Sequence, residues 1–528
     1  MAPTPSDVDV LVIGGGNAGF CSAISAAESG ARRVLLIDSC PEEWAGGNTY
    51  FTAGAFRTVH QGLQDVLPIV NNVDKATADI VDIAPYTTDN FQNDIARICL
   101  GRSDPNLART LVNESNAAVK WLAKKGVRFQ LSFNRQAYKI NGRFKFWGGM
   151  CLKTEDGGKG LIEDHRRTAQ QLGVQVLFST AAKRLVIDPS TKSVGSVIVE
   201  DRVNGEREIR TKSVILAAGG FEANPRMRSQ YLGPNWDFAK VRGTPYNNGS
   251  CLEMAIRDAS AKQAGNWSGC HSVAWDANAP SEMGDRIISN EFTKSGYPLG
   301  LMLNSEGNRF VDEGVDMRNY TYAIFGKAIL AQPGHTAFQV WDAQTTPLLR
   351  SEEYRDEVVE KITASTIEEL AQKCVKHGLR DPTKFIDTIA GYNDAVSAFQ
   401  RENPGRKFDP SVKDGLSTQS SVKKLSLAKS NWAMPLTKGP FLAIKVTCGV
   451  TFTFGGLAVD HNTAGVISAT TNTTIPGLYC AGEMLGGLFY DNYPGGSGLT
   501  SGAVFGRRAG YAAAAYVRDS SSDLAAKL

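Results

Sequence analysis

The sequence predicts an α/β fold in which a domain built on βαβ units is interrupted by a second domain. An N-terminal strand–helix–strand pattern with a glycine-rich turn indicates the first domain, and the same glycine-rich style resumes near residue 441, after a middle part of different composition. The chain has 528 residues. That length exceeds the roughly 250–300 residues at which single hydrophobic cores stop growing, so two domains are expected.

The βαβ pattern covers residues 8–38. An apolar run at 10–13 predicts a strand, the Ala- and Ser-rich segment 18–29 predicts a helix, and an apolar run at 34–37 predicts the next strand. The turn between the first strand and the helix has G-x-G-x-x-G spacing, formed by Gly14, Gly16 and Gly19. This combination is typical of a Rossmann-like dinucleotide-binding domain.

The glycine turn and the helix start predict a pyrophosphate site. Glycines, which have no side chain, let the backbone turn tightly and approach a ligand. The free N–H groups of a helix that begins near Asn17 would point at an anion. The carboxylate of Asp38, at the end of the second strand, is placed to accept hydrogen bonds from a ribose diol. The alternative is an ordinary βαβ unit with a glycine turn. The predicted cofactor ligands in this unit are Gly14, Gly16, Asn17, Ala18, Gly19 and Asp38.

Charge and cysteine content exclude several other classes of protein. The net charge is only +3 and no basic block occurs, which argues against a nucleic-acid partner. The nine cysteines include no C-x-x-C pair, so a disulfide framework, a zinc or iron–sulfur site and a c-type haem site are not supported, and we predict no metal.

Targeting signals are weak. The N-terminus carries acids and no apolar segment typical of a secretory signal, and no apolar run approaches the ~20 residues that span a bilayer. The final Ala526-Lys527-Leu528 is a conservative variant of the Ser-Lys-Leu peroxisomal address, so cytoplasmic and peroxisomal locations are both expected.

The segment after Asp38 is a second glycine-rich loop. Because glycines have no side chain, the backbone of this loop can lie flat against a planar ligand. The alternative is a plain glycine turn. Helices are predicted within 61–125, one of them opened by Asp104-Pro105, and another from the glycine cluster at 157–160 to Gly173. Strands are predicted at 174–178, 184–187, 194–199, 208–210 and 214–217, and a helix at 249–264.

The middle of the chain differs from the rest in amino-acid composition and in its predicted pattern of helices and strands. Residues 266–432 are rich in Asn, Trp, Tyr and Pro, show no βαβ pattern, and include helical segments at 366–376 and 382–399. We therefore predict one discontinuous domain, 1–265 and 433–528, with residues 266–432 inserted into it.

Four segments together resemble the flavoproteins of the fumarate reductase and succinate dehydrogenase family. They are GGGNAG at 14–19, VILAAGGFEAN at 214–224, LYCAGEMLGG at 478–487 and GGSGLTSGAVFGRRAG at 495–510. Within this family, TFTFGGL and GEMLGGLFYDNYPGGSGL most resemble the tricarballylate dehydrogenase branch. The resemblance implies a Rossmann-like FAD-binding domain of the GR2 type and an inserted α+β capping domain that closes over the flavin.

The resemblance also implies further cofactor residues. Glu483 matches a residue that binds hydroxyls of the ribityl chain, and the helix beginning at Ser497 would turn its positive end to the flavin, which raises the reduction potential. The loop after Asp38 holds no histidine for a covalent link, so noncovalent FAD is expected. The additional predicted cofactor residues are Ser39, Gly47, Asn48, Thr49, Gly54, Ala182, Ala218, Gly219, Gly220, Gly482, Glu483, Ser497, Gly498, Leu499 and Thr500.

Catalysis on a carbon–carbon bond requires a hydride exchange with the flavin and a proton exchange on the neighbouring carbon. Arg318, downstream of Arg309-Phe310, resembles the arginine that transfers the proton in this family, although the spacing is one residue longer. It could instead clamp a substrate carboxylate or form an ion pair. His271 matches a histidine that faces a substrate carboxylate, and Thr453 would line the same site.

The sequence departs from fumarate reductases at several positions. Phe452 replaces a histidine, and Asn492-Tyr493-Pro494 stands where an arginine clamps the second carboxylate. Thr293 and Gly296 stand near the positions of the Glu and Arg that relay protons to the catalytic arginine. These changes favour a larger or less charged substrate. They also leave Tyr490 or Tyr493 as an alternative base, as in ketosteroid dehydrogenases, with aromatic packing as the other interpretation.

We therefore predict an FAD-dependent oxidoreductase of the CH–CH group that acts next to a carboxylate or carbonyl of a small-molecule substrate. One alternative is a ketone-directed dehydrogenase, ene-reductase or double-bond isomerase on a secondary-metabolite intermediate. A second is a flavin electron-transfer subunit without substrate chemistry of its own. Electrons would be exchanged with oxygen, a carrier or a separate subunit.

Overall fold

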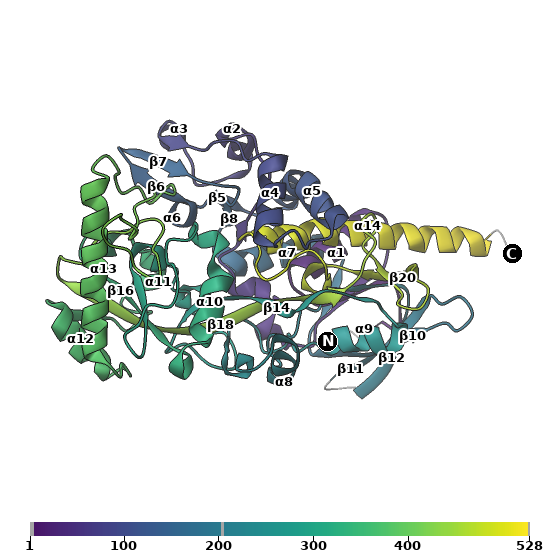
Figure 1. Cartoon of the computed structure of the whole chain (residues 1–528). Coiled ribbons are helices and arrows are strands. Elements are labelled where there is room, and N and C mark those ends of the chain that lie inside the picture. The colour runs from purple at the N-terminus through teal and green to yellow at the C-terminus, as the bar shows by residue number, and fades with distance from the viewer. Residues whose placement is uncertain (1–4, 202–204, 526–528) are drawn as a thin grey trace.

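The computed structural model describes residues 5–201 and 205–525 (Figure 1). The tripeptide at 526–528, on which the peroxisomal prediction depends, lies outside this range. Over the described helices, none is long and apolar enough to cross a membrane.

The main sheet has eight strands in the order β10-β11-β12-β1-β2-β9, with β20 paired to β12 and β19 paired to β20. Parallel pairing joins β20, β12, β1, β2 and β9, so the predicted α/β class is confirmed. The strands are β1 (Asp7–Ile13), β2 (Val34–Ile37), β9 (Gln175–Leu177), β10 (Thr180–Ile187), β11 (Val194–Asp201), β12 (Gly205–Leu216), β19 (Gly465–Ile467) and β20 (Thr474–Cys480).

Two helices from opposite ends of the chain pack side by side on this sheet: α1 (Asn17–Glu28) and α14 (Ser497–Ala525) (Figure 1). Their backbones are in contact, because a Cβ added at Gly506 would lie 2.7 Å from the Ala18 carbonyl oxygen, and one at Gly510 would lie 2.3 Å from that of Ser22. Small residues on both helices therefore bring the first and last parts of the described chain together.

The first third adds helices and short strands beside this core. Asp104 caps the long helix α5 as predicted, by accepting hydrogen bonds from the N–H groups of Asn106 and Leu107. The elements are β3 (Ala55–Phe56), α2 (Leu63–Val66), α3 (Lys75–Ala78), β4 (Val81–Asp82), α4 (Thr88–Ile98), α5 (Pro105–Lys124), β5 (Phe129–Leu131), α6 (Phe133–Gln136), β6 (Ala137–Ile140), β7 (Arg143–Phe146), β8 (Leu152–Thr154) and α7 (Gly157–Gln171).

The second sheet has six strands, and its two longest pair along almost their whole length. They are β14 (Gln263–Asp276) and β18 (Phe441–Leu457), which run from the half that holds β10–β12 to the half that holds α12 and α13 (Figure 1). The remaining elements are α8 (Pro225–Met227), β13 (Lys240–Val241), α9 (Ser250–Ala259), β15 (Leu301–Asn304), α10 (Tyr322–Leu330), β16 (Ala337–Trp341), α11 (Ser351–Tyr354), β17 (Ile362–Ala364), α12 (Ile367–Val375) and α13 (Pro382–Glu402).

Two predictions of secondary structure need correction. The helix expected at 249–264 ends at Ala259, because Ser260 has a left-handed backbone (φ 50°) and the chain then pairs with β18 as β14. The segments 208–210 and 214–217 belong mostly to one strand, β12, because its first half pairs with β11 and its second half with β1 and β20.

The division at 265/266 and 432/433 stays a prediction. Hydrophobic clusters of the middle part, such as that of Leu370 and Phe385, are separate from the large core that contains Val12 and Ile24. However, the first boundary falls inside β14, so a continuous strand connects the two halves.

Candidate active site

An elongated cavity lies between the main sheet and the strands β14 and β18. Its empty volume is about 1740 Å³, including its open mouth. One end is walled by the glycine turn after β1 and the other by buried arginine and aromatic side chains. The predicted cofactor residues that line it are Gly14, Gly16, Asn17, Ala18, Asp38, Ser39, Gly47, Asn48, Thr49, Ala182, Ala218, Gly219, Gly482, Glu483, Gly498 and Leu499.

The cofactor end is a backbone cradle. Gly16 and Gly47 face each other, since a Cβ at Gly47 would lie 3.7 Å from the Gly16 Cα. Asp38 is fixed at the same place, where its Oδ2 accepts a hydrogen bond of 2.7 Å from the Gly15 N–H. The helix α1 begins there, and its first N–H, that of Asn17, donates to the Thr49 hydroxyl at 3.0 Å. This wall of glycine backbone and small polar side chains fits the pyrophosphate and nucleoside of FAD.

Asn17 joins three helices at this end. Its Nδ2 donates to the Leu499 carbonyl on α14 at 2.9 Å, and its Oδ1 lies 2.9 Å from Nε2 of His165 on α7. Burial lowers the pKa of His165 to about 3, so the ring is neutral and donates to Asn17 through Nε2–H. The sequence did not point to His165, because its partner lies 148 residues away.

Five predicted cofactor residues lie behind the cavity wall. A Cβ at Gly19 would lie 1.8 Å from the Gly14 carbonyl oxygen, and one at Gly54 would lie 2.0 Å from Thr154 Oγ1, so both glycines serve close packing. Gly220, in the same way, leaves room for Glu483. The hydroxyls of Ser497 and Thr500 donate to the carbonyls of Pro494 and Arg57, respectively, and hold the start of α14.

The other end of the cavity carries two buried arginines that the sequence did not reveal. Arg242 follows β13, and its Nη2 donates to Asn290 Oδ1 while its Nε has no partner among the described residues. Burial lowers the pKa of Arg242 to about 10, which leaves it charged at neutral pH. Arg135, on α6, lies 3.6 Å from Glu353. The two arginines come from separate parts of the chain, and each lines the cavity as an isolated residue. No local sequence motif therefore indicates either of them.

Tyr322, at the start of α10, is a second unpredicted residue of this end. Tyr322 lines the cavity and is nine-tenths buried, and its hydroxyl is buried with no hydrogen-bond partner among the described residues. Burial by itself would raise the pKa of Tyr322, but Arg350, Arg135 and Arg318 outweigh it and lower the pKa. A buried phenol whose pKa is lowered is suited to acid–base chemistry.

The predicted catalytic residues Arg318 and Tyr490 lie outside the cavity wall. The Nη2 of Arg318 donates to the Arg135 carbonyl at 3.0 Å, so Arg318 lies one layer behind the cavity. Tyr490 packs under Arg102, whose guanidinium carbon lies 4.7 Å from the ring centre. Because neither residue reaches the cavity, their roles as proton-transfer residues have no support from the geometry.

Three of the four predicted substrate residues line the cavity: His271, Phe452 and Tyr493. The His271 ring meets the edges of Tyr322 and Tyr493 at 5.9 and 4.8 Å between centres. Burial and the nearby Arg242 lower the pKa of His271, so its ring is neutral, and its Nδ1 has no partner in the part of the chain that the structure describes. Thr453 lies behind the wall, where its N–H and hydroxyl donate to Glu483.

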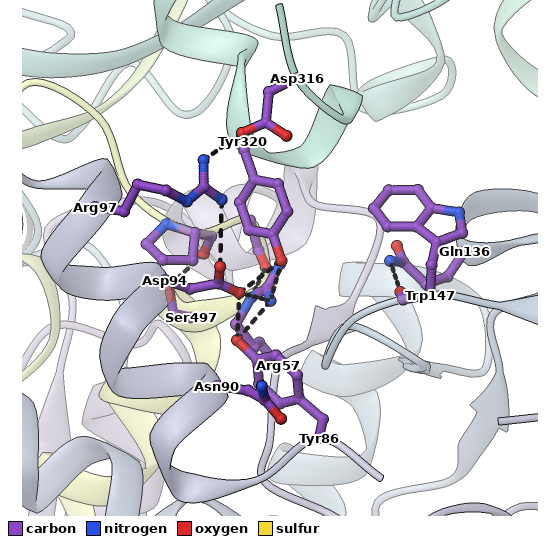
Figure 2. Close-up of polar contacts among 12 residues, drawn as sticks. Arg57, Tyr86, Asn90, Asp94, Arg97, Gln136, Trp147, Asp316, Tyr320 and Ser497 are labelled. Carbon is purple, nitrogen blue, oxygen red and sulfur yellow. Dashed lines mark hydrogen bonds and ion pairs between the residues drawn. The ribbon is translucent and has the colours of Figure 1, made fainter. Parts of the chain in front are cut away.

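A network of phenols and charges holds the turn before α10 (Figure 2). The hydroxyls of Tyr320 and Tyr86 both donate to Asp94 Oδ2, at 2.6 and 2.7 Å. Arg57 donates to both hydroxyls through Nη1 and to the Gly495 carbonyl through Nε. The network therefore connects the turn that carries Arg318 and Tyr320 to the loop that starts α14.

The fold and the cavity define an FAD-binding α/β oxidoreductase. Residues 9–499 match the model of the family described as FAD binding domain, and the chain belongs to this family. FAD is its cofactor, and the predicted fold class, family and enzyme class are confirmed.

Relatives extend over almost the whole chain. The fumarate reductase (cytochrome) of Shewanella frigidimarina is 27% identical over 517 residues, covering 98% of this chain and 79% of the relative. The vinyl phenol reductase of Lactiplantibacillus plantarum is 27% identical over 551 residues, covering 97% of each. The open conformation of a flavocytochrome c3 fumarate reductase matches with a TM-score of 0.70 and 24% identity, covering 98% of this chain and 79% of that one.

Proposed function

We propose that this chain reduces or oxidises a carbon–carbon bond next to a carboxylate of its substrate. The observation that carries the proposal is the pair of buried arginines, Arg135 and Arg242, in the wall of the cavity. A buried guanidinium with an unpartnered N–H, as at Arg242 Nε, suits a carboxylate ligand. The names of the fumarate and vinyl phenol reductases support chemistry at a carbon–carbon double bond.

The two arginines also serve the reaction itself. FAD, when bound, supplies or accepts the hydride. As the proton moves to or from the neighbouring carbon, negative charge develops on the substrate carboxylate, and Arg135 and Arg242 stabilise it in a site from which Phe452 and Tyr493 exclude water. These arginines take the place of the clamping arginine that is missing at Asn492-Tyr493-Pro494, and their charge favours a substrate that carries a carboxylate.

Tyr322 is our candidate for the proton-transfer residue. In the reductive direction its phenol donates the proton to carbon, and the positive charges of Arg350, Arg135 and Arg318 stabilise the phenolate that remains. In the oxidative direction the same phenolate accepts the proton. His271, neutral and with a free Nδ1, is placed beside Tyr322 to hydrogen-bond the substrate.

Several finer points belong to the same proposal. Two arginines suit a substrate with more than one carboxylate, as the resemblance to tricarballylate dehydrogenases implies.

The loop 39–56 contains no histidine, which supports noncovalent FAD. We propose an external electron acceptor, and a peroxisomal address at 526–528 stays a prediction.

The test is anaerobic mixing of the FAD-loaded protein with tricarboxylates, dicarboxylates, their methyl esters and enones, while flavin absorbance is recorded. We expect free carboxylates to change the flavin spectrum and their esters to leave it unchanged. A response to enones alone would support the ketone-directed alternative. No response in either oxidation state would support an electron-transfer subunit.

A further inference from the structure

Two glutamates meet beneath the cofactor part of the cavity. Glu483, on the short turn after β20, lines the cavity, whereas Glu222, after β12, is fully buried behind it. Each carboxyl group shifts the pKa of the other, so the two groups interact directly. Two ionised carboxylates this close repel strongly, and a single proton between them removes the repulsion.

The distribution of hydrogen-bond donors around the two glutamates indicates which oxygen carries the proton. Glu222 Oε1 accepts hydrogen bonds from the side-chain amides of Asn247, at 2.7 Å, and of Asn48. Glu222 Oε2 is buried and has no donor among the described residues, so it is the oxygen that lacks a hydrogen when the carboxyl is ionised. Glu483 Oε1 accepts from the Thr453 N–H at 2.7 Å and from the Thr453 hydroxyl at 3.0 Å. Glu222 Oε2 is therefore the atom that carries the proton, and Glu483 accepts it.

The surrounding charges do not compensate for two negative carboxylates. Arg228 is a cation in this region, but its guanidinium donates to the backbone carbonyl of Glu222 and to three other carbonyls. Cys270, on β14, faces the same region, and burial keeps its thiol neutral. Burial, followed by the neighbouring Glu483, raises the pKa of Glu222 well above its usual value. Burial raises the pKa of Glu483 to about 7, against the hydrogen bonds that Thr453 and Glu222 donate to it.

We propose that Glu222 is a positioning residue for FAD, and that it acts in its protonated form. Its proton bridges to Glu483 and holds that carboxylate at the cavity wall, while its other oxygen holds the amides of Asn48 and Asn247, which also line the cavity. Loss of the proton forces the two carboxylates apart and disturbs all three lining residues. This proposal requires only that FAD occupies the cavity and is independent of the substrate.

The consequence is a pH-dependent affinity for FAD. Bound cofactor covers Glu483 and buries the pair further, which favours the protonated state, so binding takes up a proton at alkaline pH and weakens as pH rises, by up to about tenfold per pH unit for one proton. The substitution Glu222→Gln reproduces the protonated acid, since the amide oxygen accepts from both asparagines and the amide N–H₂ donates to Glu483.

The experiment is titration of the apoprotein with FAD, followed by flavin fluorescence, for wild type, Glu222→Gln and Glu222→Ala. We expect wild-type affinity to fall with pH above neutrality, Glu222→Gln to bind FAD as tightly as wild type at neutral pH but with a flat pH profile, and Glu222→Ala to bind about 10–100-fold more weakly. Glu368→Gln, an exposed acid on α12, is the matched control and should follow wild type.

Thermal unfolding of the apoprotein gives an independent measurement. Carboxyl pKa values raised in the folded state contribute stability that is complete below the unfolded value and is lost as pH rises through the folded value. Wild type should therefore lose stability relative to Glu222→Gln between about pH 5 and pH 8. A parallel pH profile for the two proteins, or loss of FAD from Glu222→Gln as severe as from Glu222→Ala, would overturn the proposal.

Discussion

The two ends of the cavity are built by opposite means. The cofactor end consists mainly of glycine backbone, amides and hydroxyls, with Asp38 and Glu483 as its carboxylates. The substrate end consists of buried aromatic side chains, the neutral His271 and two positively charged residues, Arg135 and Arg242. A long anionic cofactor is held through shape and backbone N–H groups, whereas a small carboxylate needs guanidinium groups aimed at it. Substitutions should therefore separate FAD binding from substrate binding.

The largest effect is expected at Gly19. A Cβ there would lie 1.8 Å from the Gly14 carbonyl oxygen, so Gly19→Val should force α1 away from β1, cost more than about 4 kcal/mol of stability and abolish FAD binding. Bound flavin per protein and the denaturation midpoint measure this. Gly391→Ala, in α13 with open space around the Cβ position, is the control and should be neutral or slightly stabilising.

Glu353→Gln should produce the next largest loss, at the substrate end. Glu353 is fully buried and pairs with Arg350 at 2.7 Å and Arg135 at 3.6 Å, so removal of its charge should cost about 3–5 kcal/mol at neutral pH. Arg350 and Arg135 lower the pKa of Glu353 to about 2 against its burial. Because the pKa is lowered in the folded state, the contribution is complete above the unfolded value and is lost as pH falls. The difference in stability between wild type and Glu353→Gln should shrink below about pH 4.5.

Tyr322→Phe should leave FAD binding intact and remove the proton-transfer group. We expect the turnover rate to fall about 10²–10⁴-fold on the substrate found by the absorbance screen, with little change in substrate affinity. Tyr490→Phe is the matched control, because Tyr490 lies outside the cavity wall, and it should retain wild-type turnover. Equal losses in both variants would contradict the assignment of Tyr322.

Arg242→Met should weaken the carboxylate site without affecting the cofactor site. We expect the substrate dissociation constant to rise about 30–1000-fold, since one partner of a buried charged pair is removed. Perturbation of the flavin spectrum measures this constant. Arg102→Met, an exposed arginine on the far side of Tyr490, is the control. Unchanged binding in Arg242→Met would show that the carboxylate lies elsewhere.

Asp94→Asn should give the smallest of these effects. Asp94 accepts hydrogen bonds from Tyr86 and Tyr320, and the amide should cost about 1–3 kcal/mol in urea unfolding while both ends of the cavity remain. Asp394→Asn, at an exposed ion pair with Lys423, should leave the denaturation midpoint unchanged.

The same contrast explains what the sequence could and could not predict. Gly14 and Gly16 leave a local pattern, because only glycine fits where the backbone approaches a ligand or a neighbouring strand. Arg135, Arg242 and Tyr322 leave none, since α6, the loop after β13 and the start of α10 bring them together only in the folded chain. Family resemblance pointed instead to Arg318, four residues before Tyr322, which lies in the adjacent buried layer.

The backbone contact between α1 and α14 has a consequence for biogenesis. These helices stand near opposite ends of the described chain, and Asn17 and Leu499 must meet before the pyrophosphate cradle has its full wall. A ribosome that has made only the βαβ unit therefore presents an incomplete receptor for FAD. Flavin loading must follow synthesis of α14, and nascent chains that stall before it should accumulate as colourless species.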